Sequence, residues 1–180
     1  LTVNPLPTIN ISASPYQKLF PGLTTTLSST VSPLARVGGY SWLRNGSPVA
    51  GANTGTLLVG IDQLGDYRLM VTDTNGCVNT SPMTVSITDS ISSKVFIYPN
   101  PNSGMFQVRY YSVINNAGLP RGINVYDSRG TRILTKTYAI NSPYARMDID
   151  LTNQSTGVYW IEVVDTNGNR LAMGRADVIR

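Results

Sequence analysis

The sequence of 180 residues contains no histidine, a single cysteine and a single glutamate. Without histidine, Ser-His-Asp and Cys-His hydrolysis and histidine-bearing metal sites are excluded. Cys77 alone can form neither an internal disulfide nor a cysteine-rich metal site. No stretch approaches the ~20 apolar residues of a membrane-spanning helix, so no membrane insertion is predicted. No glycine-rich phosphate loop lies between a strand and a helix, which leaves nucleotide binding unsupported.

The few carboxylates are arranged poorly for catalysis or for metal binding. Asp148 and Asp150 lie two positions apart on one predicted strand, about 7 Å apart at Cα. We interpret them as solvated strand residues rather than as the facing pair of a glycosidase. The Asp-Thr-Asn-Gly segments at Asp73 and Asp165 each offer one carboxylate, whereas calcium sites collect several oxygens. The sequence therefore predicts no enzyme, metal or cofactor.

Short runs of alternating apolar and polar residues dominate the chain, and no long window has helical periodicity. The runs of the first half are 8–13, 23–29, 39–44, 47–50, 55–61, 65–73 and 82–88. Those of the second half are 95–98, 106–110, 121–127, 130–138, 145–151, 157–165 and 169–178. We predict an all-β protein of two consecutive immunoglobulin-like β-sandwich domains, with about seven strands each.

Residues 8–89 are expected to form the first sandwich. Asn45-Gly46 suits a two-residue hairpin turn, and Trp42, with Tyr40 on the same strand face, suits a buried aromatic position. This half resembles the immunoglobulin-like and polycystic-kidney-disease-type repeats of large bacterial surface proteins. Relatives of that kind often carry an early Cys-Pro-Gly and a late Asn-Gly-Cys, whose cysteines would join the two sheets by a disulfide. This chain keeps the late Cys77 but has Phe20-Pro21-Gly22 at the early site. We therefore expect Phe20 to fill core volume and Cys77 to be a sheltered, slowly reacting thiol beneath the Phe20 loop.

An ungapped internal repeat joins the two halves. The segment 65–76, from Gly-Asp-Tyr to Asp-Thr-Asn-Gly, aligns with 157–168, which runs from Gly-Val-Tyr to the same four residues. We interpret Tyr67 and Tyr159 as tyrosine-corner anchors near the start of the penultimate strand of each sandwich.

The remaining boundaries follow from composition. Residues 1–7 read as the end of a preceding repeat and a proline-rich linker, because Leu1-Thr2-Val3 resembles the closing Met83-Thr84-Val85. Residues 90–94 form a short polar linker, and residues 95–180 form the second domain. The loop 113–120 is expected to be exposed. With no initiator methionine or signal peptide, the chain is interpreted as the C-terminal part of a longer secreted protein.

The stretch 98–106 forms a rigid joint between the first two strands of the second domain. Pro99 and Pro101 fix the backbone and remove two donors, so the stretch cannot be an interior strand. Asn100 and Asn102 can hydrogen-bond neighbouring backbone, and Gly104 can adopt positive φ in a tight turn.

From this joint onward the chain resembles the C-terminal sorting domain of the bacterial type IX secretion system. The resemblance rests on three ordered signatures: Tyr98-Pro99-Asn100-Pro101 with Ser103, Gly104 and Phe106; Val125-Tyr126-Asp127 with Gly130; and Asp150-Leu151 with Gly157-Val158-Tyr159. It implies a folded secretion signal that an outer-membrane translocon recognises, a β-barrel shuttle collects and a sortase removes. The cargo would be secreted, or held at the cell surface on lipopolysaccharide.

The resemblance and the exposed basic end of the chain together give the expected recognition residues. These are Tyr98, Pro99, Asn100, Pro101, Gly104, Phe106, Asp127, Gly130, Gly157, Tyr159, Arg175 and Arg180. The expected cleavage region is Ser90, Ile91, Ser92, Ser93 and Lys94. A monomer is expected, with the first domain as a structural spacer.

The whole net charge of +4 lies in residues 91–180, where ten Lys and Arg face six Asp and Glu; residues 1–90 carry four of each. An acidic partner or nucleic acid would suit this half, but we favour a solvated basic surface and no nucleic-acid binding. Trp160 is expected to point outward with Tyr110 or Tyr111 nearby, an arrangement that could stack on sugars. An adhesive or carbohydrate-binding pair of sandwiches is therefore the alternative function.

Overall fold

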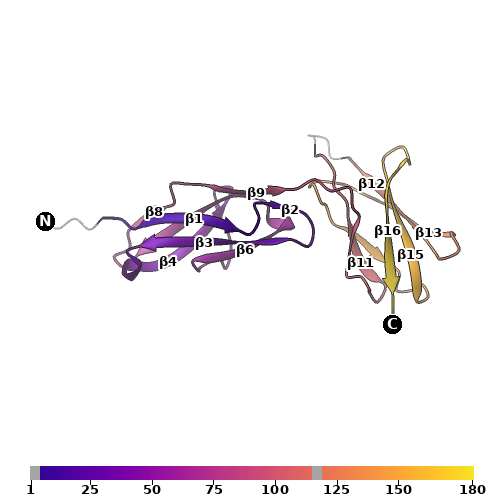
Figure 1. Ribbon diagram of the computed structural model, residues 1–180, viewed down its shortest axis with the longest axis horizontal. Coiled ribbons are helices and arrows are strands. Elements are labelled where there is room, and N and C mark those ends of the chain that lie inside the picture. Colours follow the sequence, from indigo (N-terminus) through magenta and orange to yellow (C-terminus); the bar gives the residue numbers. More distant parts are fainter. Residues whose placement is uncertain (1–4, 115–118) are drawn as a thin grey trace. The chain divides into compact units, whose positions relative to one another are not determined.

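The computed structural model describes residues 5–114 and 119–180. The described chain divides into two compact units, with the boundary between Ser90 and Ile91. Both units are built from β-strands, and each has its own hydrophobic core (Figure 1). The predicted strand at residues 1–3 lies outside the described residues, as does the 115–118 part of the loop expected to be exposed. The described ends of that loop, Val113, Ile114 and Leu119, are exposed.

The first domain is a sandwich of two sheets. One sheet has the order β1-β3-β6, and the other has the order β2-β9-β7-β4-β5 with β8 also pairing β7. Its strands are β1 (Thr8–Ser14), β2 (Lys18–Leu19), β3 (Thr24–Ser32), β4 (Val37–Arg44), β5 (Ser47–Pro48), β6 (Thr56–Gly60), β7 (Gly65–Asp73), β8 (Val78–Thr80) and β9 (Val85–Asp89). Two short 3-10 helices, η1 (Leu34–Arg36) and η2 (Ile61–Gln63), connect strands.

Alternation along β7 places Tyr67, Leu69 and Val71 in the core, as their spacing predicts. Trp42 on β4 is fully buried, and its indole N–H donates to the carbonyl of Thr54 at 2.9 Å. A buried indole keeps its stabilising contribution only when that N–H has a partner. The prediction of a buried aromatic on this strand is confirmed.

The β4–β5 hairpin turns at Asn45 and Gly46, whose φ angles are 51° and 83°. Both central positions of a type I′ turn require positive φ, so the Asn-Gly prediction is confirmed. The Asn45 side chain also accepts from the backbone N–H of Asp66 at 2.8 Å, which ties the hairpin to β7.

Two expectations about the first domain are wrong. Cys77 is exposed, because it follows the tight turn after Asp73 and precedes β8, an edge strand. Phe20 is half-buried, and the neighbouring Leu19 is fully buried and supplies the core contact instead. The alternation of β2 places Leu19 inward, so the core volume near the missing disulfide partner is filled one position earlier.

The second domain is a sandwich of a three-stranded sheet, β10-β11-β14, and a four-stranded sheet, β13-β12-β15-β16. Its strands are β10 (Phe96–Tyr98), β11 (Met105–Arg109), β12 (Arg121–Tyr126), β13 (Arg132–Tyr138), β14 (Met147–Asp150), β15 (Gly157–Val164) and β16 (Arg170–Val178). The two inner faces meet in a core that includes Phe106, Val108, Ile123, Met147 and Ile161. Apolar residues at alternate positions of both sheets account for this layer.

Candidate functional site

The joint between β10 and β11 is built around Gly104. Its φ is +109°, and its N–H donates to the Asn102 side chain at 2.8 Å. A Cβ at Gly104 would lie 3.0 Å from both Cα and N of Thr152, so the backbone of the loop after β14 leaves no room for a side chain. The predicted positive φ is confirmed, and close backbone approach gives a second reason for glycine.

The same joint closes the edge of β16. The side-chain amide of Asn100 donates to the carbonyl of Arg175 at 2.9 Å and accepts from the N–H of Asp177 at 2.8 Å. The backbone of Asn102 then exchanges hydrogen bonds with Asp177 and Ile179 at 2.9 and 2.8 Å. We call Asn100 and Asn102 together the β16 clasp. The Asn102 side chain accepts from the nearby Gly104 N–H, as predicted. The Asn100 side chain instead bonds the backbone of β16, in the way that the backbone of a neighbouring strand would.

The basic end of the chain is less free than its sequence suggests. The Arg180 guanidinium is exposed, yet it donates to the carbonyls of Leu151, Thr152 and Gln154. Arg175 forms a bidentate pair with Asp177 at 2.8 and 3.1 Å. Arg180 is exposed, as its sequence position predicts, but its guanidinium is engaged by backbone carbonyls in the loop after β14.

Asp127 and Gly130 build the β12–β13 turn. The Asp127 carboxylate accepts from the N–H groups of Arg129 and Thr131 at 2.9 and 2.8 Å, and Gly130 has φ +83°. The Asp73 and Asp165 turns have the same pattern. Each carboxylate accepts from the backbone N–H groups of the residues two and four positions later, and the glycine of each turn has a φ of +83° or +82°. Hydrogen bonds from Asn169 and Asn167 lower the pKa of Asp165. These carboxylates are occupied by backbone donors, which explains Asp and Gly without a ligand.

Tyr67 and Tyr159 make the same contact in the two domains. Each hydroxyl donates to the carbonyl of the residue four positions earlier, Gln63 for Tyr67 and Ser155 for Tyr159, the latter at 2.6 Å. Both rings are almost fully buried. The tyrosine-corner interpretation of the repeat is thus supported by geometry on both sides. Gly157, at the start of β15, has open space around its Cα.

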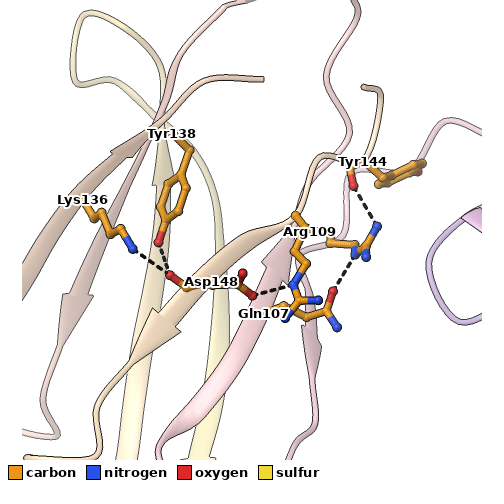
Figure 2. Close-up of polar contacts among 7 residues, drawn as sticks. Gln107, Arg109, Lys136, Tyr138, Tyr144 and Asp148 are labelled. Atoms are coloured by element: carbon orange, nitrogen blue, oxygen red, sulfur yellow. Dashed lines mark hydrogen bonds and ion pairs between the residues drawn. The ribbon is translucent and has the colours of Figure 1, made fainter. Parts of the chain in front are cut away.

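The outer face of the three-stranded sheet carries a buried cation. Arg109 on β11 donates to the Gln107 side chain at 2.8 Å and to the carbonyl of Tyr144 at 3.1 Å (Figure 2). Nearby, the carbonyl of Asp148 accepts from Lys136 and Tyr138, which reach it from β13. The Asp148 carboxylate pairs with Arg146 at 2.6 Å. The contacts of Lys136 and Tyr138 tie β13 to β14.

Tyr98 and Pro99 border this face. The Tyr98 ring stacks on Phe96 with centroids 6.4 Å apart, and Phe96 meets Tyr144 edge-on at 5.9 Å. Burial raises the pKa of Tyr98, and the positive charge of Arg109 lowers it by a smaller amount. The Tyr98 hydroxyl has no hydrogen-bond partner among the described residues. Pro99 and Pro101 are exposed, whereas Phe106 lies in the core. Of the first signature, Tyr98, Pro99, Asn100, Pro101 and Ser103 therefore present side-chain surface, and the Asn100 amide is engaged by β16.

The outer face of the four-stranded sheet carries the exposed aromatic. Trp160 is 42% exposed, as its alternation with Tyr159 and Ile161 predicts. Its aromatic neighbour is Tyr126, the directly opposite residue on β12, and not Tyr110 or Tyr111. Tyr110 packs on the core and Tyr111 meets Tyr144 at 5.4 Å. The pairing with Tyr126 depends on sheet register, which one sequence does not specify.

The segment 90–94 has no regular secondary structure, and Ile91 is 76% exposed. Within the described residues there is no group of three or more Cys, Asp or Glu that could hold a metal, and no helix long and apolar enough to span a membrane. Asp148 and Asp150 both face outward from β14, each with its own partner, since Asp150 accepts from Thr152. Those Thr152 hydrogen bonds lower the pKa of Asp150.

Residues 96–172 match the family model of the secretion system C-terminal sorting domain. The match begins with β10 and ends inside β16, so it contains all three signatures. Nothing among the curated proteins matches this chain.

Three solved structures are similar to this chain over most of its length. Fibronectin(III)-like modules of Clostridium thermocellum CbhA are 13% identical with a TM-score of 0.38, over 96% of this chain and 93% of that one. Carbohydrate-binding modules of the β-sandwich superfamily are 10% identical with a TM-score of 0.40, over 85% of this chain and 87% of that one. Dimeric latent PorU from Porphyromonas gingivalis is 14% identical with a TM-score of 0.40, over 96% of this chain and 20% of that one. At these identities and scores the likenesses carry no functional argument.

Proposed function

We propose, from the match of residues 96–172 to the secretion system C-terminal sorting domain family, that the chain belongs to a bacterial protein exported by the type IX system. The sorting domain implies secretion or export to the cell surface, and interaction with the export machinery. In the finer proposal, residues 95–180 are the address, the translocon and a β-barrel shuttle recognise it, and residues 8–89 are a spacer.

The observation that carries the proposal is the agreement between the signatures and the completed fold. Asn100 closes β16, Asp127 makes the β12–β13 turn, and Tyr159 anchors β15. Each signature thus builds a different part of one rigid domain. A preformed surface can be bound without the ordering cost of a disordered tail, which suits a domain that serves as an address.

Removal by a sortase is proposed for the region Ser90–Lys94. The described backbone there is irregular, Ile91 is exposed, and the segment separates two complete cores. Proteolysis favours exposed irregular segments over paired strands. After cleavage the cargo would be released or attached to surface lipopolysaccharide, with no enzymatic activity supplied by either domain.

The test is to place a fluorescent reporter before the complete chain, with a periplasmic export leader, in a host that has type IX machinery. The reporter should reach the outside, where added protease can digest it, and the second domain should be missing from the surface product. The same fusion should stay periplasmic in a strain without the translocon. A matched fusion ending at Asp89 should also stay periplasmic. A reporter that remains inside while the host exports its own cargo would refute the proposal.

The alternative is an adhesive or carbohydrate-binding pair of sandwiches. The exposed Trp160 beside Tyr126 favours it, because aromatic faces can stack on apolar faces of ligands. A binding module must remain on the mature protein, whereas an address should be absent. Detection of residues 95–180 on the surface product would therefore support the alternative.

A further inference from the structure

The signatures leave few polar groups available to a receptor. Asn100, Asp127, Tyr159 and Arg180 all use their polar side-chain atoms within the domain. A receptor must therefore read side chains that the fold leaves exposed. The widest regular surface that remains is the outer face of the four-stranded sheet.

Strand register places four side chains of that face in one row. Tyr126 lies opposite Arg132 on β13 and opposite Trp160 on β15, and Trp160 lies opposite Arg175 on β16. Directly opposite side chains on one face are close neighbours. We call Arg132, Tyr126, Trp160 and Arg175 the arginine–aromatic row: two aromatic rings flanked by two cations.

The adjacent row holds the Tyr126 ring in place. Glu162 accepts from the side-chain amide of Asn124 at 2.9 Å and from the Tyr126 hydroxyl at 2.8 Å. Asn124 in turn accepts from Thr135 at 2.9 Å, so the network crosses β13, β12 and β15. The hydrogen bond to Glu162 is the main cause that raises the pKa of Tyr126. Tyr126 is therefore fixed before any partner arrives.

Apolar surface continues from the row onto β16. Met173, opposite Glu162, is 45% exposed, and Leu171 is 38% exposed. A hollow of about 450 Å³ lies here, lined by Tyr126, Gly130, Trp160, Glu162, Arg170 and Met173. The centres of protein interfaces are enriched in Trp, Tyr, Met and Arg and depleted in Lys and Glu. The exposed residues of this face have that composition.

The charge of the face specifies the partner's chemistry. Arg170 lines the hollow, and Arg132 and Arg175 lie at the two ends of the row. Glu162 accepts hydrogen bonds from Asn124 and Tyr126, and Asp177 is paired with Arg175. The three arginines outnumber the two carboxylates of this face, Glu162 and Asp177, and Glu162 already accepts two hydrogen bonds on one of its oxygens. The face therefore offers arginine donors and aromatic surface, which suit an acidic partner.

We infer that this outer face, centred on the arginine–aromatic row, is the docking surface for an acidic, partly apolar protein surface of the export machinery. The inference rests on the proposed function and specifies where recognition occurs. Electrostatic complementarity would guide the encounter, and Trp160 would supply most of the affinity on contact.

The experiment uses the complete chain behind the reporter and measures the external fraction at a fixed early time. Trp160→Ala and Arg170→Glu should each reduce export about tenfold, as expected for loss of an interface anchor or reversal of a complementary charge. The matched controls are Val113→Ala, which removes another exposed apolar side chain, and Lys18→Glu, which makes the same charge change in the first domain. Both controls should be exported like the parent.

Thermal unfolding of each variant separates docking from stability. If Trp160→Ala unfolds early, Arg170→Glu still tests the surface, because an exposed charge at this position supports no core contact. Parent-like export of both variants would overturn the inference while leaving the proposed function intact. Failure of the parent itself to be exported would instead refute the proposed function. Normal export of Trp160→Ala together with loss of retardation in polysaccharide gels would assign the face to sugars and overturn the inference.

Discussion

The two domains share one local pattern and complete it differently. In both, a tyrosine corner starts a strand (β7 or β15) and an Asp-x-x-Gly turn ends it. In the first domain the returning strand is broken: β8 and β9 pair with separate parts of β7. In the second domain β16 pairs with β15 from Gly157 to Val164.

Proline placement accounts for this difference. Pro82 lies between β8 and β9 and has no N–H to donate, so the ladder stops there. Ser81 covers the gap, since its N–H donates to the carbonyl of Leu69 and its hydroxyl accepts from the Leu69 N–H. No proline occurs in 169–178. The comparison shows how one repeat is followed by two short, separate strands in the first domain and by one unbroken strand in the second.

The largest expected loss of stability comes from disrupting the packing of the Gly104 joint on the Thr152 backbone, which occurs in the second domain alone. Gly104→Val places a branched side chain at positive φ, 3.0 Å from the Thr152 backbone, and should cost about 3–5 kcal/mol. Each domain has one tryptophan, Trp42 or Trp160, so urea unfolding of Trp→Phe backgrounds follows each domain separately. The loss should be confined to the Trp160 signal.

Gly168→Val is the matched control, because Gly168 also has positive φ but has no atom within 4 Å of the added Cβ. It should cost only the backbone strain, about 1–2 kcal/mol. Equal losses for the two variants would show that close approach to Thr152 is unimportant.

A smaller and symmetric effect is expected at the corners. Tyr67→Phe and Tyr159→Phe each remove one hydroxyl donor to a backbone carbonyl and should each cost about 1–1.5 kcal/mol in their own domain. Urea unfolding with the two tryptophan reporters measures both. A loss in one domain only would break the equivalence of the corners.

Asn100→Ala should weaken the β16 clasp without disturbing the core. It removes two hydrogen bonds to β16, so the second domain should lose about 1–2 kcal/mol and the Asp177 amide should exchange faster with solvent. Asn167→Ala, whose side chain is exposed in the Asp165 turn, is the control and should leave exchange at Asp177 unchanged. Unchanged exchange in Asn100→Ala would disprove the clasp.

The smallest effect on stability is expected at Cys77. Because the thiol is exposed, a maleimide should label it in the native state about as fast as in urea, and Cys77→Ser should change stability by less than about 0.5 kcal/mol. Intact-mass measurement over time follows the labelling. If labelling required denaturant, the Cys77 thiol would be buried in the native state, contrary to this prediction.

Much of the fold could be predicted, because alternation and turn chemistry act over few residues. Asn45-Gly46, the Tyr67 and Tyr159 strands and Gly104 are local patterns, and their conformations follow from steric rules. The short β2 and β8 were missed, because two or three residues show no periodicity.

The site was less predictable because it depends on register between distant strands. Nothing local in Tyr126 indicates that it faces Trp160, or in Asn100 that it reaches Arg175. Exposure of Cys77 was mispredicted because the relatives' disulfide suggested burial. One signal was available: the only glutamate, Glu162, alternates outward beside Trp160 on a strand otherwise rich in apolar residues.

The β16 clasp also bears on folding kinetics. The Asn100–Asp177 contact joins residues 77 positions apart, so it adds strongly to the contact order of a domain this small. Contacts of that span form slowly, after shorter loops have closed. We expect the joint to dock onto β16 late, when β15 and β16, which a short turn connects, are already paired. An intermediate with an undocked joint would lack the Asn100 hydrogen bonds to Arg175 and Asp177 beside the arginine–aromatic row, so only a chain that has finished folding would present the complete docking surface.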